Sequence, residues 1–179
     1  MSKANILVTG IIPEQGLTKL RETFDVFYDP EIETREWILE HLAEYDGLLL
    51  MGTKADKELI DAGKNLKIIT ANGVGFDHID IEYAKQKGIV VSNCPQGVRV
   101  PTAEMTFALL LAATRRLYFY DKVVREGDWI DVSEQKYMGL SLQGKTLGVY
   151  GFGRIGSEVA KFAQVFGMDV IYNYEHRLD

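Results

Sequence analysis

The 179-residue chain is 46% hydrophobic and 26% charged, a composition typical of a globular protein long enough to bury a core. Its formal net charge of −6 and pI of about 5.2, without a basic stripe, argue against a nucleic-acid-binding surface. The longest apolar stretch, 107–113, is far shorter than the roughly 18 residues of a membrane span, and the N-terminus has no signal-peptide pattern. Because Cys94 is the only cysteine, no intrachain disulfide can form, and we expect a cytoplasmic protein without membrane or nucleic-acid partners.

Short apolar runs alternate with helix-like segments through the first half of the chain. The expected strands are 4–9, 25–28, 47–51, 67–71 and 89–92. The expected helices are 13–24, 34–45, 56–64 and 81–86. Five strands separated by four helices predict a parallel sheet with helices on both faces.

The second half begins where Pro95, Gln96 and Gly97 break this alternation. We expect one long helix over 101–125, with Pro101 in its first turn, where a missing N–H has no cost. A polar, irregular segment over 127–144, then a strand, a helix and a last strand at 169–174 complete the chain. The helical stripe expected in the core or in a dimer interface consists of Phe107, Leu110, Leu111 and Thr114.

The most informative motif is a Gly-x-Gly-x-x-Gly loop between a strand and a helix, which is the context of a dinucleotide site. In such a site Gly151 permits a tight turn, Gly153 lets a pyrophosphate approach the backbone, and Gly156 lets the helix pack closely on the strand. Arg154 and Ile155 occupy the positions that meet the pyrophosphate, although Arg154 also fits an ordinary surface arginine. The free N–H groups of the helix N-terminus attract the phosphates.

The end of the last strand bears on the choice between NAD and NADP. An acidic residue about 20 positions past the motif binds the ribose 2′-OH and favours NAD. Tyr174 stands at that place and Glu175 follows it, so Glu175 could serve if the loop is shifted by one residue. His176 and Arg177 could instead accept a 2′-phosphate. NADP is therefore not excluded, and NAD is the prediction.

Four segments in register resemble the D-isomer-specific 2-hydroxyacid dehydrogenases, with the glyoxylate/hydroxypyruvate reductases as the nearest branch. Residues 72–80 are similar to the family's G-x-G-x-D-N/H-I-D segment, and 88–95 to its G-I-x-V-x-N-x-P strand. Residues 102–104 resemble its V/T-A-E helix start, and 151–156 its G-F-G-R-I-G loop. Together these segments extend the resemblance from about Leu48 to the end of the chain.

The resemblance implies an α/β protein of two domains. Residues 1–99 would form a flavodoxin-like, parallel-sheet substrate domain, and 100–179 the first, incomplete part of an NAD(P)-binding Rossmann domain. The implied reaction is hydride transfer between a nicotinamide and the C2 atom of a 2-oxo or D-2-hydroxy acid. Family members pair through their cofactor domains, so a homodimer is expected.

The resemblance also implies site residues. The amides of Gly73, Val74 and Gly75 would bind the substrate carboxylate; alternatively, these residues form a simple turn after a strand. Thr102 would lie near the nicotinamide; alternatively, it is an ordinary residue in the first turn of a helix. Lys54 ends a strand and could face the substrate or solvent. The family's catalytic Arg, Glu and His have no counterpart in 1–179, so we expect a truncated chain that is inactive alone.

Two other hypotheses remain open. One is a non-catalytic, dinucleotide-sensing protein like the co-repressors that share this fold. The other is an inert domain fragment, whose incomplete cofactor sheet leaves a strand edge uncovered.

The scattered histidines predict no metal site: His41 is expected at the surface, and His78 in a structural role. Cys94 is expected to act as a small apolar residue.

Overall fold

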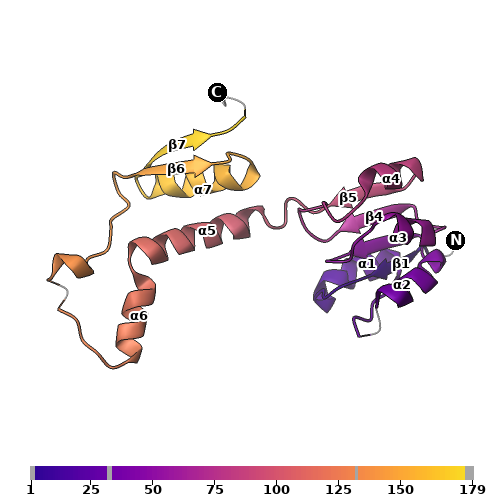
Figure 1. Ribbon diagram of the computed structural model, residues 1–179, viewed down its shortest axis with the longest axis horizontal. Coiled ribbons are helices and arrows are strands. Elements are labelled where there is room, and N and C mark those ends of the chain that lie inside the picture. The colour runs from indigo at the N-terminus through magenta and orange to yellow at the C-terminus, as the bar shows by residue number, and fades with distance from the viewer. Residues whose placement is uncertain (1–2, 32–33, 132, 176–179) are drawn as a thin grey trace. The chain divides into compact units, whose positions relative to one another are not determined.

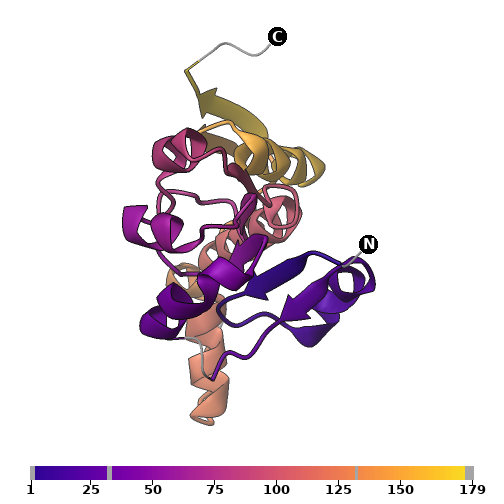
Figure 2. The same cartoon turned by 90° about the vertical axis from the view of Figure 1, so that its right-hand side faces the viewer.

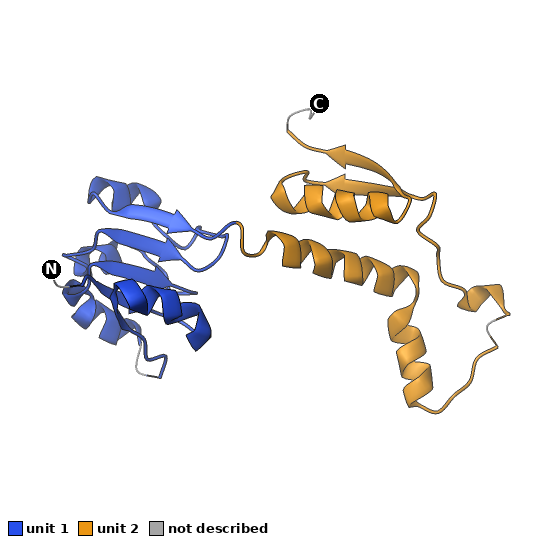
Figure 3. Ribbon diagram, turned by 180° about the vertical axis from the view of Figure 1, so that it is seen from behind, with its two compact units in different colours: residues 1–95 blue, residues 96–179 orange. Residues whose placement is uncertain are grey.

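The computed structural model describes residues 3–31, 34–131 and 133–175. By its internal contacts the chain separates into two compact units, residues 1–95 and 96–179 (Figure 3). Each unit contains its own sheet (Figure 1). Each also has its own apolar core. The two units are therefore described separately.

Unit 1 is built on a five-stranded sheet with the order β2-β1-β3-β4-β5. Every neighbouring pair is parallel, with Leu48 opposite Ile69 and Thr70 opposite Ser92. The strands are β1 (Asn5–Val8), β2 (Asp25–Phe27), β3 (Gly47–Leu50), β4 (Ile68–Ala71) and β5 (Val90–Asn93). This is the strand order of flavodoxin-like doubly wound sheets, and the parallel α/β fold is confirmed.

The helices of unit 1 lie within the predicted ranges, although a 3-10 turn begins the first and ends the second. They are η1 (Glu14–Leu17) with α1 (Thr18–Thr23), α2 (Arg35–His41) with η2 (Leu42–Glu44), α3 (Lys57–Ala62) and α4 (Ile81–Gln86). Thr34, Asp56 and Asp80 are the N-caps of α2, α3 and α4, and each side chain accepts the N–H three residues on. Such caps satisfy donors that the helix itself leaves open.

The sheet of unit 1 separates two apolar clusters. Leu7 of β1 belongs to a cluster with residues of α2, α3 and α4, whereas its neighbours Ile6 and Val8 pack with Leu17. Alternate residues of a strand point to opposite faces, so β1 is covered on both sides. Coverage is incomplete elsewhere, because Val90 of β5 is 60% exposed.

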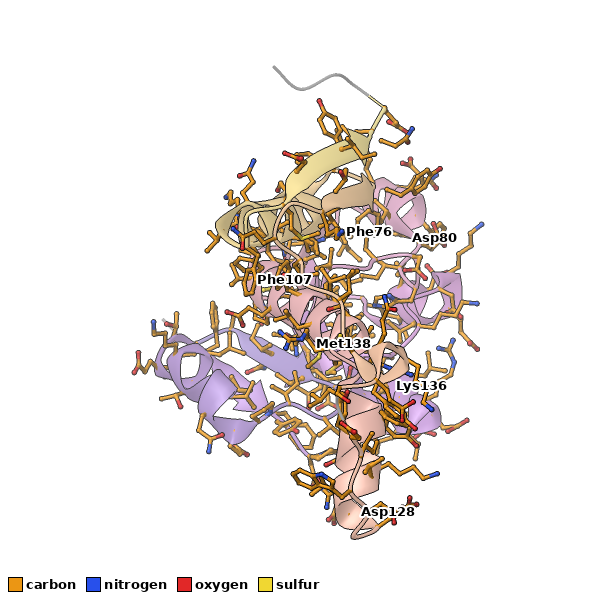
Figure 4. All side chains as sticks on the ribbon, turned by 90° about the vertical axis from the view of Figure 1, so that its left-hand side faces the viewer. Phe76, Asp80, Phe107, Asp128, Lys136 and Met138 are labelled. Atoms are coloured by element: carbon orange, nitrogen blue, oxygen red, sulfur yellow. The ribbon has the colours of Figure 1, made fainter. Side chains whose placement is uncertain are left out.

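Unit 2 packs helices on a two-stranded parallel sheet. Its elements are α5 (Arg99–Thr114), α6 (Leu117–Arg125), η3 (Gln135–Tyr137), β6 (Thr146–Tyr150), α7 (Arg154–Val165) and β7 (Asp169–Asn173). Its core includes Phe107 of α5 (Figure 4). The Phe107 ring contacts the rings of Phe162 and Phe166. Part of the predicted stripe therefore lies in the core of this unit. The opposite sheet face is open: Tyr150 is 92% exposed.

The prediction of one continuous helix over 101–125 is wrong. Arg116 adopts a left-handed conformation (φ +56°) and separates α5 from α6, which turns away from it (Figure 1 and Figure 2). The cause is a returning segment: the Leu140 N–H donates to the Thr114 carbonyl at 2.7 Å. Gly139 permits this approach, since a Cβ there would lie 2.9 Å from the Thr114 oxygen. Pro101 lies in the first turn of α5, as expected.

An ion-pair network joins two helices of unit 1. Arg35 of α2 donates to Asp56 at 2.8 and 3.0 Å and to Glu58 at 2.8 Å. The hydrogen bond from Arg35 holds the pKa of Asp56 below its usual range, with a further contribution from the Leu59 N–H. Asp56 therefore both caps α3 and fixes α2 beside it.

Replacement of Asp56 should change how the stability of unit 1 depends on pH. A carboxylate with a lowered pKa in the folded state stabilises above its unfolded pKa and loses that effect as pH falls through the folded pKa. As the pH falls from about 5 to about 2, the free energy of unfolding should thus decrease less in Asp56→Asn than in the parent chain. Asn still accepts the N–H that Asp56 caps, whereas Ala does not. At pH 7 the free energy of unfolding of Asp56→Ala should therefore be about 1 kcal/mol lower than that of Asp56→Asn.

Urea unfolding followed by Trp37 fluorescence would measure this effect. A Trp129→Phe background removes the second tryptophan, which is 94% exposed and so contributes little packing. Equal acid sensitivity of the parent and Asp56→Asn chains would show that the Arg35 contact does not contribute to folding.

Candidate functional site

The predicted substrate-binding glycines lie in the loop between β4 and α4 of unit 1. Asn72 begins the loop and donates its N–H to the Leu50 carbonyl at 2.8 Å. The carbonyl of Gly73 accepts the Cys94 N–H at 2.8 Å, and the carbonyl of Val74 accepts Asn93 Nδ2 at 2.8 Å. The loop is thus held to the end of β3 by the Asn72 N–H and to the end of β5 by the carbonyls of Gly73 and Val74.

The N–H groups of the same loop are not used in this way. Within the described part of the chain, the amides of Gly73, Val74 and Gly75 donate to no acceptor. A Cβ at Gly73 would meet nothing within 4 Å, and Val74 is 38% exposed. Successive backbone N–H groups without acceptors can together bind an anion. The geometry therefore suits a carboxylate.

Lys54 lies beside a separate cavity rather than beside these glycines. This cavity of about 520 Å³ is lined by 54–58 and 77–80, and the two segments pair as the Ala55 N–H donates to the His78 carbonyl at 2.9 Å. His78 Nε2 is buried there without a hydrogen-bond partner among the described residues. Phe76 and Asp80 mark the stretch that joins the glycine loop to α4 (Figure 4).

The second site is the loop between β6 and α7 in unit 2, where each glycine meets a different requirement. Gly151 has φ +94°, a conformation that other residues rarely adopt. A Cβ on Gly156 would lie 2.1 Å from the Gly151 carbonyl oxygen, so only glycine fits between helix and strand. A Cβ on Gly153 would meet nothing within 4 Å. The open side of the loop is thus at Gly153.

The first turn of α7 faces this open side with unused donors. Gly153 is the N-cap and has no side chain to accept them, and the first helical bond runs from Ser157 N–H to the Gly153 carbonyl at 3.0 Å. Among the described residues, the amides of Arg154, Ile155 and Gly156 have no acceptor. The 12-residue helix adds the positive end of its dipole. This arrangement can bind a phosphate group.

Arg154 and Ile155 have different surroundings. The Arg154 side chain is exposed and forms no ion pair with any described residue. Ile155 is half-buried and packs on the core of unit 2. Arg154 is therefore free to meet an anion, whereas Ile155 can contribute only its backbone N–H.

The residues predicted to contact the ribose follow β7, next to this loop. The Gly151 N–H donates to the Asn173 carbonyl at 2.9 Å, which continues the parallel pairing of β6 and β7 as far as the glycine loop. Tyr174 and Glu175 come next and are both exposed. The alternative residues His176 and Arg177 lie outside the described residues.

Thr102 is an exposed residue in the first turn of α5. Its N–H donates to the Val98 carbonyl at 3.0 Å, and its carbonyl accepts Thr106 Oγ1 at 2.8 Å. These are ordinary helical contacts of an exposed residue.

Two residues that hold the sites were not singled out from the sequence. One is Asn93. It ends the strand beside the one that leads into the glycine loop, and this position could have indicated a contact with the loop. The other is Glu158 of α7, which is 9% exposed and pairs with Arg99 at 3.4 Å and Lys161 at 3.1 Å. A glutamate in an amphipathic helix usually faces solvent, so its sequence pattern had no signal for burial.

Two minor expectations are corrected. His41 is half-buried: its ring stacks on Trp37 at 4.3 Å between centroids, and Nδ1 lies 2.9 Å from the Trp37 carbonyl oxygen. Cys94 is exposed rather than packed in apolar surroundings.

In the described ranges, no group of three or more His, Cys, Asp or Glu side chains could hold a metal ion. Nor does any described helix combine the length and apolar content that a bilayer crossing requires.

Comparison with known proteins gives a consistent result. Residues 6–172 match the family model described as "D-isomer specific 2-hydroxyacid dehydrogenase, catalytic domain". A glyoxylate reductase of Thermococcus litoralis is 41% identical over 177 residues, with 95% of this chain and 54% of that protein covered. A glycerate dehydrogenase of Hyphomicrobium methylovorum is 42% identical over 182 residues, with 99% and 56% covered. The chain thus spans about half the length of the curated relatives it matches.

Solved structures agree in fold. The TT0316 protein from Thermus thermophilus superimposes with a TM-score of 0.86 at 37% identity, covering 97% of this chain and 57% of that one. An Entamoeba histolytica 3-phosphoglycerate dehydrogenase with bound NAD+ has a TM-score of 0.76 at 27% identity, covering 97% and 55%. An acyclic imino acid reductase in complex with NADPH and D-Arg has a TM-score of 0.82 at 31% identity, covering 98% and 58%.

Addition of one methyl group at Gly156 should destabilise unit 2. Gly156→Ala places a Cβ against a backbone carbonyl that cannot move without distorting the loop, so we expect a loss of about 1–3 kcal/mol in the free energy of unfolding. Hydrogen exchange of the α7 amides would measure it.

Gly153→Ala is the matched control, since its Cβ meets open space and its φ of −79° suits alanine. Equal α7 protection in the two variants would contradict the close approach of Gly156 to Gly151.

Proposed function

The chain belongs to the D-isomer-specific 2-hydroxyacid dehydrogenase family, and we propose that the whole protein interconverts a 2-oxo acid and a D-2-hydroxy acid by hydride transfer with a nicotinamide dinucleotide. The observation that carries the proposal is the glycine loop at the N-terminus of α7. It combines a left-handed glycine, an open glycine and a glycine in backbone contact in the order that a dinucleotide pyrophosphate requires.

We assign unit 1 (residues 1–95) to the substrate domain expected over 1–99, and unit 2 (96–179) to the first part of the cofactor domain expected over 100–179. In the substrate domain, the amides of Gly73, Val74 and Gly75 receive the carboxylate of the acid. Three N–H groups that donate to no described residue support this role, because an anion at this position would satisfy them. The relatives named above as glyoxylate reductase and glycerate dehydrogenase act on small acids of this class.

In the cofactor domain, the N–H groups of Arg154, Ile155 and Gly156 receive the pyrophosphate, and the exposed Arg154 guanidinium adds charge. The nicotinamide, when bound, supplies or accepts the hydride. Glu175 follows β7 beside this loop and accepts the ribose 2′-OH, which favours NAD over NADP. Thr102 lies near the nicotinamide end. Because NAD+ and NADPH complexes both occur among similar structures, this choice rests on Glu175.

Turnover needs two further functions. A proton donor must serve the carbonyl oxygen, and a cation must polarise the carbonyl and hold the carboxylate. The Arg, Glu and His that serve these functions in the family have no counterpart in 1–179, and we place them in a part of the protein beyond residue 179. Residues 1–179 alone then bind both ligands without transferring hydride.

We also propose that the whole protein is a homodimer. Large apolar side chains are exposed on α6 and in the segment after it, among them Tyr118 (82%), Val124 (73%) and Trp129 (94%). Burial of such side chains against a second copy removes apolar surface from water.

Nucleotide binding tests the proposal directly. Titration of the 15N-labelled chain with NADH should shift the amides of residues 151–157, most strongly those of 154–156, because the phosphates accept the N–H groups of these three residues. Gly153→Ala folds normally but places a methyl group on the open side of the loop, so its Kd should rise at least about tenfold. Lys145→Ala, which precedes β6 at its other end, is the control and should bind as the parent does. An unchanged spectrum at 151–157 at millimolar NADH would contradict the dinucleotide assignment.

Glu175→Gln tests the cofactor choice. Loss of the carboxylate should weaken NADH binding about five- to tenfold, as expected for one charge-assisted hydrogen bond of roughly 1 kcal/mol. NADPH binding should stay equal or improve, because the carboxylate no longer repels the 2′-phosphate. Parallel titrations measure the ratio of the two dissociation constants. Equal effects on both nucleotides would exclude Glu175 as the discriminating residue.

A further inference from the structure

We propose that Asn93 is a positioning residue that directs the Gly75 N–H toward the substrate carboxylate. The inference rests on the proposed function, because it concerns the loop assigned to that carboxylate. Asn93 ends β5 and lies opposite Ala71, the last residue of β4, in the parallel register. The loop that carries Gly73, Val74 and Gly75 therefore begins directly beside the Asn93 side chain.

The hydrogen bonds of this loop differ between its carbonyl and N–H groups. Asn93 Nδ2 donates to the Val74 carbonyl at 2.8 Å, and the Cys94 N–H donates to the Gly73 carbonyl at 2.8 Å. The Phe76 carbonyl accepts the Ile79 N–H at 3.0 Å. By contrast, the three N–H groups from Gly73 to Gly75 have no acceptor within the described ranges. The protein thus holds the carbonyls of Gly73 and Val74, whereas the N–H groups of Gly73, Val74 and Gly75 donate to no described residue.

Peptide geometry turns this pattern into a statement about direction. A trans peptide unit is planar, so the carbonyl of one residue and the N–H of the next point in opposite directions. The contact with Asn93 holds the Val74 carbonyl and thereby directs the Gly75 N–H to the opposite side. The Cys94 backbone contact holds the Gly73 carbonyl and directs the Val74 N–H in the same manner.

The two contacts differ in what they require of the sequence. The Cys94 donor is a backbone N–H that almost any residue supplies. The Asn93 donor is a side-chain amide, which must be short enough to reach the Val74 carbonyl and must present nitrogen rather than oxygen. Glycine at position 75 is conformationally free, so without this contact its peptide unit could rotate. The direction of the Gly75 N–H thus depends on one side chain.

Anion titration of the chain separates these two peptide units. Oxamate, a stable analogue of a 2-oxo acid, would be added at constant ionic strength to the 15N-labelled chain. In the parent chain the amides of Val74 and Gly75 should both shift. In Asn93→Ala the shift of Gly75 should be lost, that of Val74 should remain, and the Kd should rise about five- to tenfold. Asn93→Asp keeps the side-chain volume but presents oxygen to the carbonyl, and it should behave like Asn93→Ala.

Ser92→Ala is the matched control. Its hydroxyl lies 3.0 Å from Thr70 Oγ1, so the substitution removes a polar contact between the same two strands without touching the loop. It should leave both the Kd and the Gly75 shift unchanged. Unperturbed amides of β4 and β5 in each variant verify that the sheet is intact.

The outcomes distinguish the two proposals. If the parent chain shows no oxamate shift at Val74 or Gly75, the carboxylate role of the loop is wrong and the inference fails with it. If the parent responds and Asn93→Ala keeps the Gly75 shift with an equal Kd, the carboxylate role stands and the positioning role of Asn93 is wrong. An equal loss of both shifts would show general loosening of the loop, which also overturns the specific link to Gly75.

Discussion

Both candidate sites depend on one constraint: a peptide unit whose carbonyl is bound within the protein leaves its N–H free to bind an anion outside it. In a parallel sheet the carboxyl ends of all strands lie at one edge, where the loops begin and the ladder of hydrogen bonds stops. Unit 1 meets this constraint with the loop after β4, whose carbonyls are held by Asn93 and Cys94. Unit 2 meets it with the first turn of α7, where the helix uses the carbonyls and leaves the amides.

The rest of each unit keeps these donors in place. In unit 1, Asp56 and Asp80 cap the helices that follow β3 and β4, and Arg35 ties α2 to α3. In unit 2, Glu158 is nearly buried on α7 and pairs with Arg99 of α5. A buried charge that loses its partner is costly, so this pair adds to the apolar contacts that hold α5 beside α7. Packing and capping thus hold the loops, while the loops themselves remain available to ligands.

Glycine has three separate uses in the loop between β6 and α7, and only one of them is conformational. Gly151 needs a left-handed backbone, Gly156 needs room beside a carbonyl, and Gly153 leaves the approach to the helix N-terminus open. Substitutions at these positions therefore affect different properties: strain, packing and ligand access. This separation makes the loop testable residue by residue, since a variant that keeps its fold and loses binding cannot be explained by misfolding.

The sequence alone determined the parallel α/β class, the family and the position of both glycine loops, because strand periodicity and loop motifs are local properties of the chain. It did not reveal the break at Arg116, since the contact that ends α5 comes from Leu140, well beyond that helix in the chain. It also did not reveal Asn93 or Glu158, whose roles depend on neighbours from other elements. Only the tertiary structure brings β5 beside the loop after β4, and only there does an asparagine at a strand end become a donor to Val74. Local pattern therefore specified where the two glycine loops lie, and long-range packing decided which of their backbone groups are held within the protein.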